Sequence, residues 1–312
     1  MQLTRIKINM EPWQDPTVWF IPGFLALIFI ELYLSNKMKM KVHKPIDSIS
    51  SIGMGLGSLA IGIFVKAAAF FIFTWLNQFA IFPALREINV LSLADNLKHW
   101  WAWLILIFLD DFSFYWHHRL SHHVRILWAA HVNHHSSVNY NLAVALRQSW
   151  TEILYKYAFW LWLPIIGFPP LMILIMMSFS LIYQFWVHTK TIKKLGFLEL
   201  FMNTPSHHRV HHASNVRYLD RNHAGIFIIW DRLFGTFAKE EESDPVVYGL
   251  TKNIETYNLF KIASHEFISI ADDFKRAPDL KTKMKYLFMP PGWSHDGSTK
   301  TSDELRKEQK LA

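Results

Sequence analysis

The sequence predicts an all-α fold, and more specifically a polytopic helical bundle in a membrane. Three observations favour this fold class. Hydrophobic residues make up 51 % of the 312 residues and charged residues only 18 %, which is below the roughly 25 % charged fraction of soluble domains. The apolar residues are gathered in long blocks, and 13 of the 17 histidines lie in two short windows.

The composition also excludes several classes of protein. The chain has no cysteine, so it is not a disulfide scaffold, an iron–sulfur protein or a thiolate zinc protein. Its aromatic fraction of 16 % is too high for a disordered chain. The net charge of +7 in so apolar a chain favours anionic lipid headgroups as partners. We therefore expect a membrane partner and no nucleic acid.

Five apolar blocks are expected to form the bundle, in this order: residues 18–34, 52–82, 100–116, 153–166 and 171–187. The first is close to the roughly 20 apolar residues that span a bilayer, whereas the second is long for one crossing and short for two. The third carries Asp110 and Asp111. The last two flank Gly167-Phe168-Pro169-Pro170, a sequence typical of a hairpin apex.

Lysine clusters set the expected topology. Lysines follow the first block at 37–44 and the fifth block at 190–194, and the positive-inside rule places both loops in the cytoplasm. Counting the second block as one crossing gives five spans, with the N-terminus outside and both histidine windows on the cytoplasmic side. If that block is a hairpin, both windows move outside together. We expect an integral, multi-pass protein of a bacterial inner membrane or the eukaryotic endoplasmic reticulum, and a disordered end at residues 297–312.

The histidines form three motifs with helical spacing. His118 and His122 make an HxxxH, while His131, His134 and His135 make an HxxHH. A second HxxHH contains His208, His211 and His212. Positions i, i+3 and i+4 share one helix face, so each motif presents two or three imidazoles together. Eight nitrogen ligands are enough for two metal ions, and imidazole suits iron, zinc, copper and nickel. The sequence thus predicts a histidine-lined di-metal cap on the bundle.

Alternative roles for the histidines fit the pattern less well. A single histidine is more often structural than a ligand, and we assign that role to His43, His99, His265 and His295. A metal-transport loop would be flexible and repetitive, whereas these motifs lie in aromatic, helix-compatible sequence. Haem needs one or two axial histidines, and a zinc protease needs HExxH, which the sequence lacks.

The three motifs, in this order, resemble the fatty acid hydroxylase/sterol desaturase superfamily of membrane di-iron oxygenases. The resemblance covers about residues 50–265 and includes the flanking segments DDFSFYWHHRLSHH, LWAAHVNHHSSVNYNLAVALRQSW, LIYQFWVHT, NTPSHHRVHHASN and DRNHAGIFIIWDRLFGTF. The segments ALRQSW, YQFWVHT and NTPSHHRVHH are similar to the alkylglycerol monooxygenase branch, which cleaves ether lipids with tetrahydropterin.

The resemblance implies roles for individual residues. The eight motif histidines would be the catalytic ligands of two Fe²⁺ ions that react with O₂, and His188 matches an additional histidine that completes such a site. Gln184 and His207 lie close enough in sequence to support the ligands. The animal enzymes of this branch carry a glutamate where this chain has His123, so His123 is the residue expected to decide which reductant is used, a tetrahydropterin or another external donor or electron-transfer protein.

Each ligand imidazole needs an acceptor for its second ring nitrogen. Nearby candidates are Asp110, Asp111, Asp220, Asp231, Asn133, Asn203 and Asn222. Asp111 is the best of them, because it precedes His118 by two helical turns in a stretch that otherwise excludes charge.

The resemblance therefore implies an oxidoreductase that hydroxylates a lipid C–H, first of all the ether-adjacent carbon of an alkylglycerol lipid. The alternatives are a hydroxylase or desaturase of a fatty acyl, sterol or carotenoid chain, and a non-catalytic membrane protein that binds or transports metal. We expect an N-terminal span and basic loop at 1–48, a catalytic domain at 49–265 and a cytoplasmic tail at 266–312.

Overall fold

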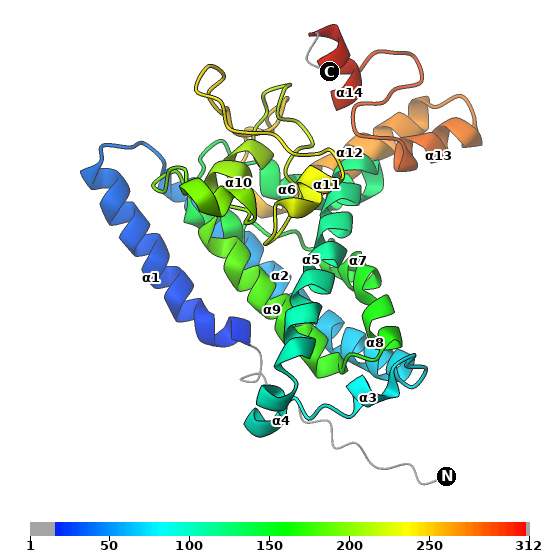
Figure 1. The fold of residues 1–312 in the computed structure, drawn as a ribbon. Helices are drawn as coiled ribbons and strands as arrows, with labels where there is room; N and C mark the ends of the chain where they lie inside the picture. The colour runs from blue at the N-terminus through cyan, green and yellow to red at the C-terminus, as the bar shows by residue number, and fades with distance from the viewer. Residues whose placement is uncertain (1–15, 310–312) are drawn as a thin grey trace.

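A computed structural model of the chain describes residues 16–309, and its regular secondary structure is helical, with irregular segments between the helices (Figure 1). Two isolated β-bridges, Met202 with Phe227 and Ala213 with Tyr248, are the extended pairings found in that range. The helices of the lower bundle are α1 (Pro16–Lys37), α2 (Pro45–Asn77), α3 (Pro83–Arg86), α4 (Leu93–Lys98), α5 (Trp100–His123), α7 (Ile153–Lys156), η3 (Tyr157–Trp160), α8 (Trp162–Ile166) and α9 (Pro170–Trp186). The predicted all-α class is confirmed.

A cap of shorter elements lies above the bundle in Figure 1. It contains α6 (Arg125–His135), η2 (Leu142–Leu146), η4 (Gly196–Leu200), α10 (Pro205–His211), α11 (Ile229–Leu233), α12 (Leu259–Arg276), α13 (Leu280–Phe288) and α14 (Ser302–Glu308). The N-terminal part of the first expected domain, residues 1–15, lies outside the described residues.

The second apolar block is one continuous helix rather than a hairpin. Helix α2 runs without interruption from Pro45 to Asn77, and Asn77 then donates hydrogen bonds to the carbonyls of Pro164 (3.0 Å) and Phe168 (3.1 Å). The break predicted at 167–170 is present. Gly167 has φ +133°, and a Cβ there would lie 2.5 Å from the Phe82 carbonyl oxygen, so only glycine fits.

Two of the described helices are long and apolar enough to cross a membrane, Trp19–Lys37 and Pro45–Asn77. The apolar helices Ile153–Ile166 and Pro170–Trp186 are shorter, and the first of these is divided into α7, η3 and α8. The five-span count predicted from the sequence therefore rests on three segments that do not have the length and apolarity of a full span.

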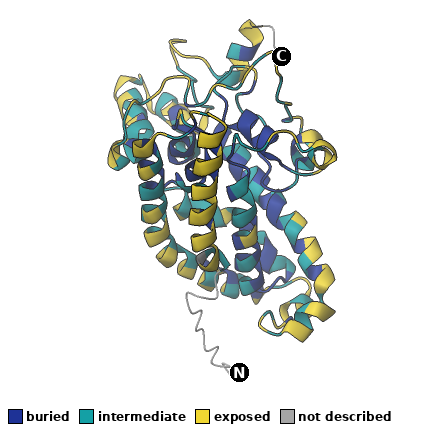
Figure 2. Cartoon of the chain, turned by 90° about the vertical axis from the view of Figure 1, so that its left-hand side faces the viewer, coloured by how far each residue is buried: buried dark blue, intermediate teal, exposed yellow. Residues whose placement is uncertain are grey.

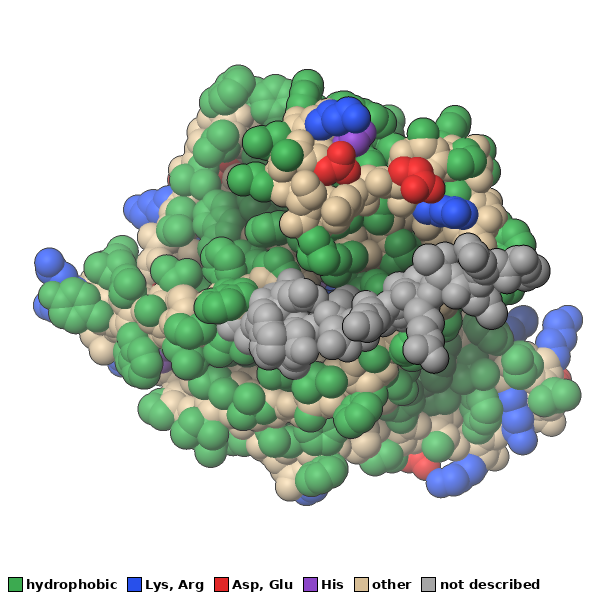
Figure 3. Space-filling model, turned by 90° about the horizontal axis from the view of Figure 1, so that it is seen from below, with side chains coloured by type: hydrophobic (Ala, Val, Ile, Leu, Met, Phe, Trp, Pro, Cys, Tyr) green, Lys and Arg blue, Asp and Glu red, His purple; other side chains and the backbone are tan. Residues whose placement is uncertain are grey.

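The bundle buries a core of aromatic and aliphatic side chains between α2, α5 and α9. Its centre includes Phe73, Leu106, Trp160 and Met172. Burial is concentrated inside the bundle, whereas the outer helix turned toward the viewer in Figure 2 is largely exposed. Exposed side chains on the long helices are themselves apolar, such as Phe29 (68 %) and Phe64 (78 %). Hydrophobic groups also cover most of the lower face in Figure 3, as expected of a surface that meets lipid.

The C-terminal segment is ordered over most of its length, so the predicted disorder is wrong for residues 302–308. Thr301 and Glu304 form a capping box that starts α14, and Arg306 is buried and donates to the Leu219 carbonyl (2.6 Å). Residues 310–312 lie outside the described residues. The expected domain boundary at 265/266 falls inside α12, which Arg125 of α6 ties to the cap through Glu266 (2.8 Å) and Asp273 (2.5 Å).

Candidate metal centre

The nine histidines expected as metal ligands form two adjacent buried groups. The first holds His118, His122, His131, His135 and His211, and the second holds His134, His188, His208 and His212. Within each group, one ring nitrogen from every histidine lies within 4.8 Å of the others. We call them the five-histidine group and the four-histidine group.

Helix geometry explains how the motifs are shared between the groups. Val124 has an extended conformation that ends α5 and starts α6, so HxxxH and the first HxxHH lie on two consecutive helices that meet at a sharp corner. In α6, His131 and His135 are spaced i, i+4 and enter the five-histidine group, whereas His134 enters the other. In α10 the division is reversed, because His208 and His212 form the i, i+4 pair of the four-histidine group.

One loop fixes the outer nitrogens of three histidines in the five-histidine group. His118 Nδ1 lies 2.7 Å from the His223 carbonyl oxygen, and His211 Nδ1 lies 2.9 Å from that of Arg221. His122 Nδ1 lies 3.2 Å from a carboxylate oxygen of Asp220. An Nδ1–H that donates to an oxygen leaves the lone pair on Nε2, which is the atom available to a metal.

Two further histidines are fixed from other elements. His131 Nδ1 lies 3.0 Å from Glu152 Oε2, and His188 Nδ1 lies 2.8 Å from the Gln184 carbonyl oxygen. Sequence reasoning did not identify Glu152. It lies 17 residues beyond the HxxHH motif, at the start of a short helix, and no spacing rule connects it to His131.

The inner nitrogens converge at distances that favour a shared cation. Nε2–Nε2 separations are 3.0 Å for His118–His131, 3.1 Å for His134–His188 and 2.8 Å for His188–His208. Where Nδ1 carries the proton, as the acceptors above require of His118, His131 and His188, the facing Nε2 atoms present lone pairs to their neighbours. Between His118 and His131, where both facing nitrogens carry lone pairs, the contact is repulsive without a cation. All three separations are comparable to ligand separations around a metal bound at about 2.0–2.1 Å.

Buried nitrogens without partners give a second test of the fit. Nε2 of His122, His211 and His212 is buried and has no hydrogen-bond partner among residues 16–309. Leaving a buried polar atom unpaired is costly, and an ion in each group would satisfy these atoms. The donor set is entirely imidazole, which suits iron, zinc, copper or nickel.

Burial keeps the imidazoles neutral. It lowers the pKa of His188 to about 4. Burial, followed by the neighbouring imidazoles, lowers the pKa values of His134, His208 and His212 well below the usual range. The four-histidine group is therefore deprotonated at pH 7, as metal binding requires.

The residues expected to support the ligands make different contacts. Asp111 accepts from the backbone N–H of Ile226 (2.7 Å) and Phe227 (2.8 Å) and from Trp230 Nε1 (3.1 Å), so it anchors the cap rather than a histidine. Gln184 serves His188 through its carbonyl, while its side chain donates to Ser180 (3.0 Å).

His207 and His123 lie outside both groups. His207 packs on Phe237, with 5.4 Å between ring centroids, and its Nδ1 lies 3.2 Å from the Met202 carbonyl oxygen. His123 is half-buried at the end of α5, with its ring 6.1 Å from that of His223. Of the seven acceptor candidates, Asp220 is the one whose side chain lies within hydrogen-bonding distance of a candidate ligand nitrogen, Nδ1 of His122.

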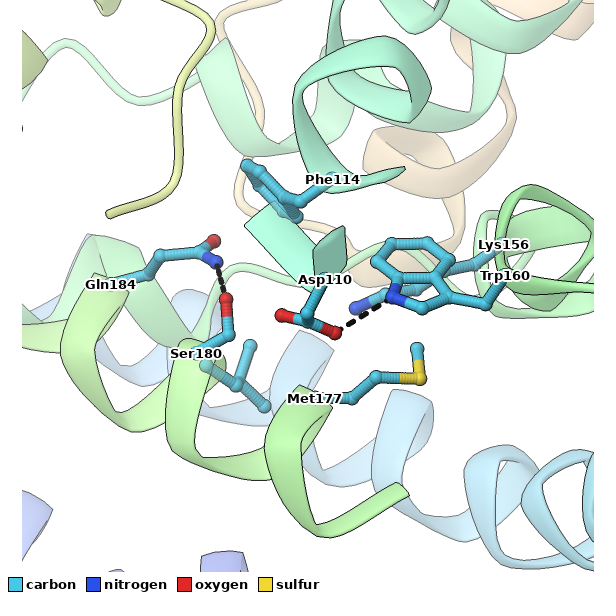
Figure 4. A pocket seen from close by; sticks show the side chains of 8 residues that line it. Asp110, Phe114, Lys156, Trp160, Met177, Ser180 and Gln184 are labelled. Carbon is cyan, nitrogen blue, oxygen red and sulfur yellow. Dashed lines mark hydrogen bonds between the residues drawn. The ribbon is translucent and has the colours of Figure 1, made fainter. Parts of the chain in front are cut away.

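One cavity adjoins the centre, and a second lies within the bundle. The first, of about 1070 Å³, reaches His122, His135 and His211, and its walls include Trp128 and residues of the segment 249–256. The second, of about 10 Å³, lies deeper in the bundle (Figure 4). There Asp110 accepts from Trp160 Nε1 (2.7 Å), and Lys156 and Gln184 complete the lining. The five-histidine group is thus the one that opens to a space large enough for a small molecule.

Comparison with known proteins gives one matching family. The fatty acid hydroxylase family model matches residues 103–236, the segment that holds all three histidine motifs. No solved structure matches.

Curated relatives agree with that family. The chain is 40 % identical to human alkylglycerol monooxygenase over 87 % of this chain and 58 % of the relative. It is 36 % identical to the Xenopus tropicalis alkylglycerol monooxygenase over 91 % of this chain and 61 % of the relative. The ornithine lipid hydroxylase of Rhizobium tropici is 27 % identical over 50 % of this chain and 47 % of that protein. The chain spans about three fifths of the length of these alkylglycerol monooxygenases.

Proposed function

The chain belongs to the fatty acid hydroxylase family, and from that premise we propose that it is a membrane-bound, O₂-dependent lipid monooxygenase with two iron ions. The observation that carries this proposal is the pair of adjacent, all-imidazole groups. One metal would explain either group alone, whereas two groups side by side are what a reaction between two metals and O₂ requires. A metal that only stabilised the fold would require neither a second group of ligands nor the cavity beside the five-histidine group.

The proposed ligands are the eight motif histidines and His188. When bound, the iron pair supplies the oxidising power to insert an oxygen atom of O₂ into a C–H bond, which acid–base groups cannot do. The protein's part is to hold the imidazoles neutral and oriented. Backbone carbonyls and the carboxylates of Asp220 and Glu152 orient them from outside the centre, and burial keeps them neutral.

We propose an alkylglycerol ether lipid as the substrate, because the relatives that match over most of this chain carry that activity in their names. Hydroxylation of the carbon beside the ether oxygen consumes O₂, two electrons and two protons, and gives a hemiacetal and water. The hemiacetal then separates into an aldehyde and a glycerol derivative. The electrons come from an external donor, a tetrahydropterin or an electron-transfer protein, and His123 is proposed to line its site.

The proposed setting is a membrane with the histidine centre on the cytoplasmic side. Five crossings require α5, the helices at 153–166 and α9 to accompany α1 and α2 through the bilayer. The catalytic domain then begins near residue 49, and residues 266–309, which continue α12 and pack on the cap, lie on the cytoplasmic side. Tags placed at Gly196 and within 139–141 should both label from the cytoplasm. Labelling of the two tags from opposite sides would contradict a single centre.

Product analysis tests the function directly. The purified chain, loaded with Fe²⁺ in lipid nanodiscs, is given a 1-O-alkylglycerol and reduced tetrahydropterin, and O₂ uptake is followed beside the products. We expect one aldehyde for each O₂ consumed. Hydroxylated or desaturated acyl, sterol or carotenoid products in place of the aldehyde would reassign the substrate. Two bound metals without O₂ uptake, for any donor or lipid offered, would identify a metal-binding protein instead.

A further inference from the structure

Glu152 connects the five-histidine group to a histidine outside it. Its carboxylate reaches His131 Nδ1 with Oε2 (3.0 Å) and His117 Nε2 with Oε1 (3.4 Å). The carboxylate is 15 % exposed, and His117 is 1 % exposed. Its own backbone N–H donates to Ser149 Oγ (3.3 Å), which fixes the start of α7. The carboxylate is therefore hydrogen-bonded to one imidazole, that of the proposed ligand His131, and lies close to a second, that of His117.

The two histidine groups differ in what holds their outer nitrogens. In the five-histidine group, His122 and His131 face carboxylates, and His118 and His211 face carbonyl oxygens. In the four-histidine group, only a carbonyl oxygen faces His188. Nδ1 of His134 and Nδ1 of His208 are buried without a hydrogen-bond partner within residues 16–309.

This difference has a chemical consequence. A carboxylate that accepts the Nδ1–H of an imidazole fixes its tautomer and makes the opposite nitrogen a stronger donor to a metal. An imidazole with no acceptor can rotate or adopt the wrong tautomer, and it loses that benefit. The five-histidine group has the more complete support, and Glu152 supplies the part of it that comes from outside the 220–223 loop.

We propose that Glu152 is a positioning residue which, by accepting from His131 while it faces His117, makes the five-histidine group the tighter of two unequal metal sites. This inference rests on the proposed function only in requiring that both groups bind metal. It does not depend on the substrate, the donor or turnover.

Metal affinity tests the proposal on the full-length chain in detergent. Metal-free protein is titrated with Zn²⁺ in competition with a chromogenic chelator, and the two dissociation constants are resolved. For the native sequence we expect two unequal sites. Glu152→Ala should weaken the tighter site by about 10–100-fold, the usual cost of losing such a partner, and leave the weaker site unchanged. Glu152→Gln keeps the volume and one acceptor oxygen, so it should weaken the same site by less.

Glu266→Ala is the matched control. Its carboxylate is 18 % exposed and is paired with Arg125 (2.8 Å), but it contacts no proposed ligand. It should leave both affinities unchanged. A Glu152 that only supports the fold would lower yield and thermal stability in Glu152→Ala while both sites kept their affinities, and that result would overturn the proposal. Equal weakening of both sites would also overturn it.

If Glu152→Ala does not fold, Glu152→Gln decides: an unchanged tighter site refutes the role. Failure of the wider function has a different signature. A chain that binds no metal refutes the proposed function before Glu152 is tested, whereas a chain that binds two metals and oxidises no lipid leaves the affinity measurement fully interpretable.

Discussion

Replacing Asp111 should destabilise the cap in a graded way that the structure allows us to work out. Asp111 is fully buried on α5 and accepts three hydrogen bonds, from Ile226 N, Phe227 N and Trp230 Nε1, at 2.7, 2.8 and 3.1 Å. Each buried donor left without a partner costs about 1–3 kcal/mol. Asp111→Ala leaves all three donors without their acceptor, and two of these bonds are only partly buried, so we expect a loss of about 3 kcal/mol in the free energy of unfolding.

Two further variants divide that loss. Asp111→Asn keeps the volume and one acceptor oxygen, but its amide group faces a donor, so we expect a loss of roughly 1–3 kcal/mol. Trp230→Phe removes only the longest of the three bonds and leaves the carboxylate with two partners. Its loss of hydrogen bonding should be about 1 kcal/mol. The expected order of stability is native, then Trp230→Phe, then Asp111→Asn, then Asp111→Ala.

Loss of Asp111 should also disturb the histidine centre, because residues 226 and 227, which Asp111 anchors, closely follow the 220–223 loop that orients three of the histidines. Only two residues separate Ile226 from His223, whose carbonyl oxygen faces His118. We therefore expect Asp111→Ala to lose metal from the five-histidine group first.

Thermal unfolding in detergent, followed by circular dichroism, measures the stability, and metal analysis of the same samples measures occupancy. A loss of about 3 kcal/mol corresponds to a fall of roughly 5–10 °C in the midpoint. The reasoning is refuted if Asp111→Ala unfolds with the native midpoint, or if it proves more stable than Asp111→Asn.

Three other outcomes are expected. The purified chain should hold about two metal ions, and the double variant His131→Ala/His211→Ala should lose both metal and activity; full occupancy in that variant would contradict the ligand assignment. His123→Ala should keep its metal but change turnover and its dependence on tetrahydropterin, whereas loss of metal would make His123 a ligand. Burial lowers the pKa of His207 to about 4 from about 6.5 in the unfolded chain. The unfolded state therefore binds the proton first as the pH falls, so His207 alone should contribute a decline in stability of about 3 kcal/mol between pH 6.5 and 4, in addition to the decline that the other buried imidazoles cause. His207→Asn should flatten that decline in a pH series of unfolding midpoints, and an unchanged slope would contradict the burial argument.

Local patterns were enough to predict the helices that carry the proposed ligands. The spacing of HxxxH and the two HxxHH motifs depends only on the 3.6-residue repeat, and the Gly167–Pro170 break depends only on the dihedral limits of its residues. The same reasoning failed where stability comes from distant contacts. Residues 302–308 read as polar and disordered, yet Arg306 is buried and donates to the carbonyl of Leu219, 87 positions away.

The supporting residues of the centre were harder to predict for a related reason. Asp111 lies two turns before His118 on the same helix face. The partner of a side chain on that face nevertheless depends on which segment packs against it, and Asp111 accepts hydrogen bonds from the 226–230 segment instead of from a histidine. Glu152 was missed because its contact with His131 joins separate elements. Sequence spacing can place imidazoles on a helix face, but it cannot say which acceptor a fold brings to the outer nitrogen.

The loop at 220–223 supplies acceptors to the outer nitrogens of His118, His122 and His211. Asp220 and Asn222 both have positive φ, 53° and 56°, a conformation that Asn and Asp tolerate better than other residues with a Cβ. The Asn222 side chain holds the conformation by donating to the carbonyls of His207 (3.0 Å) and Ala238 (2.7 Å) and accepting from Ala238 N (2.8 Å). Such backbone persists only where its surroundings over-determine it. The strained loop is thus fixed by contacts to residues that are not themselves proposed ligands, His207 and Ala238, so holding its acceptors against three imidazoles does not require a bound metal.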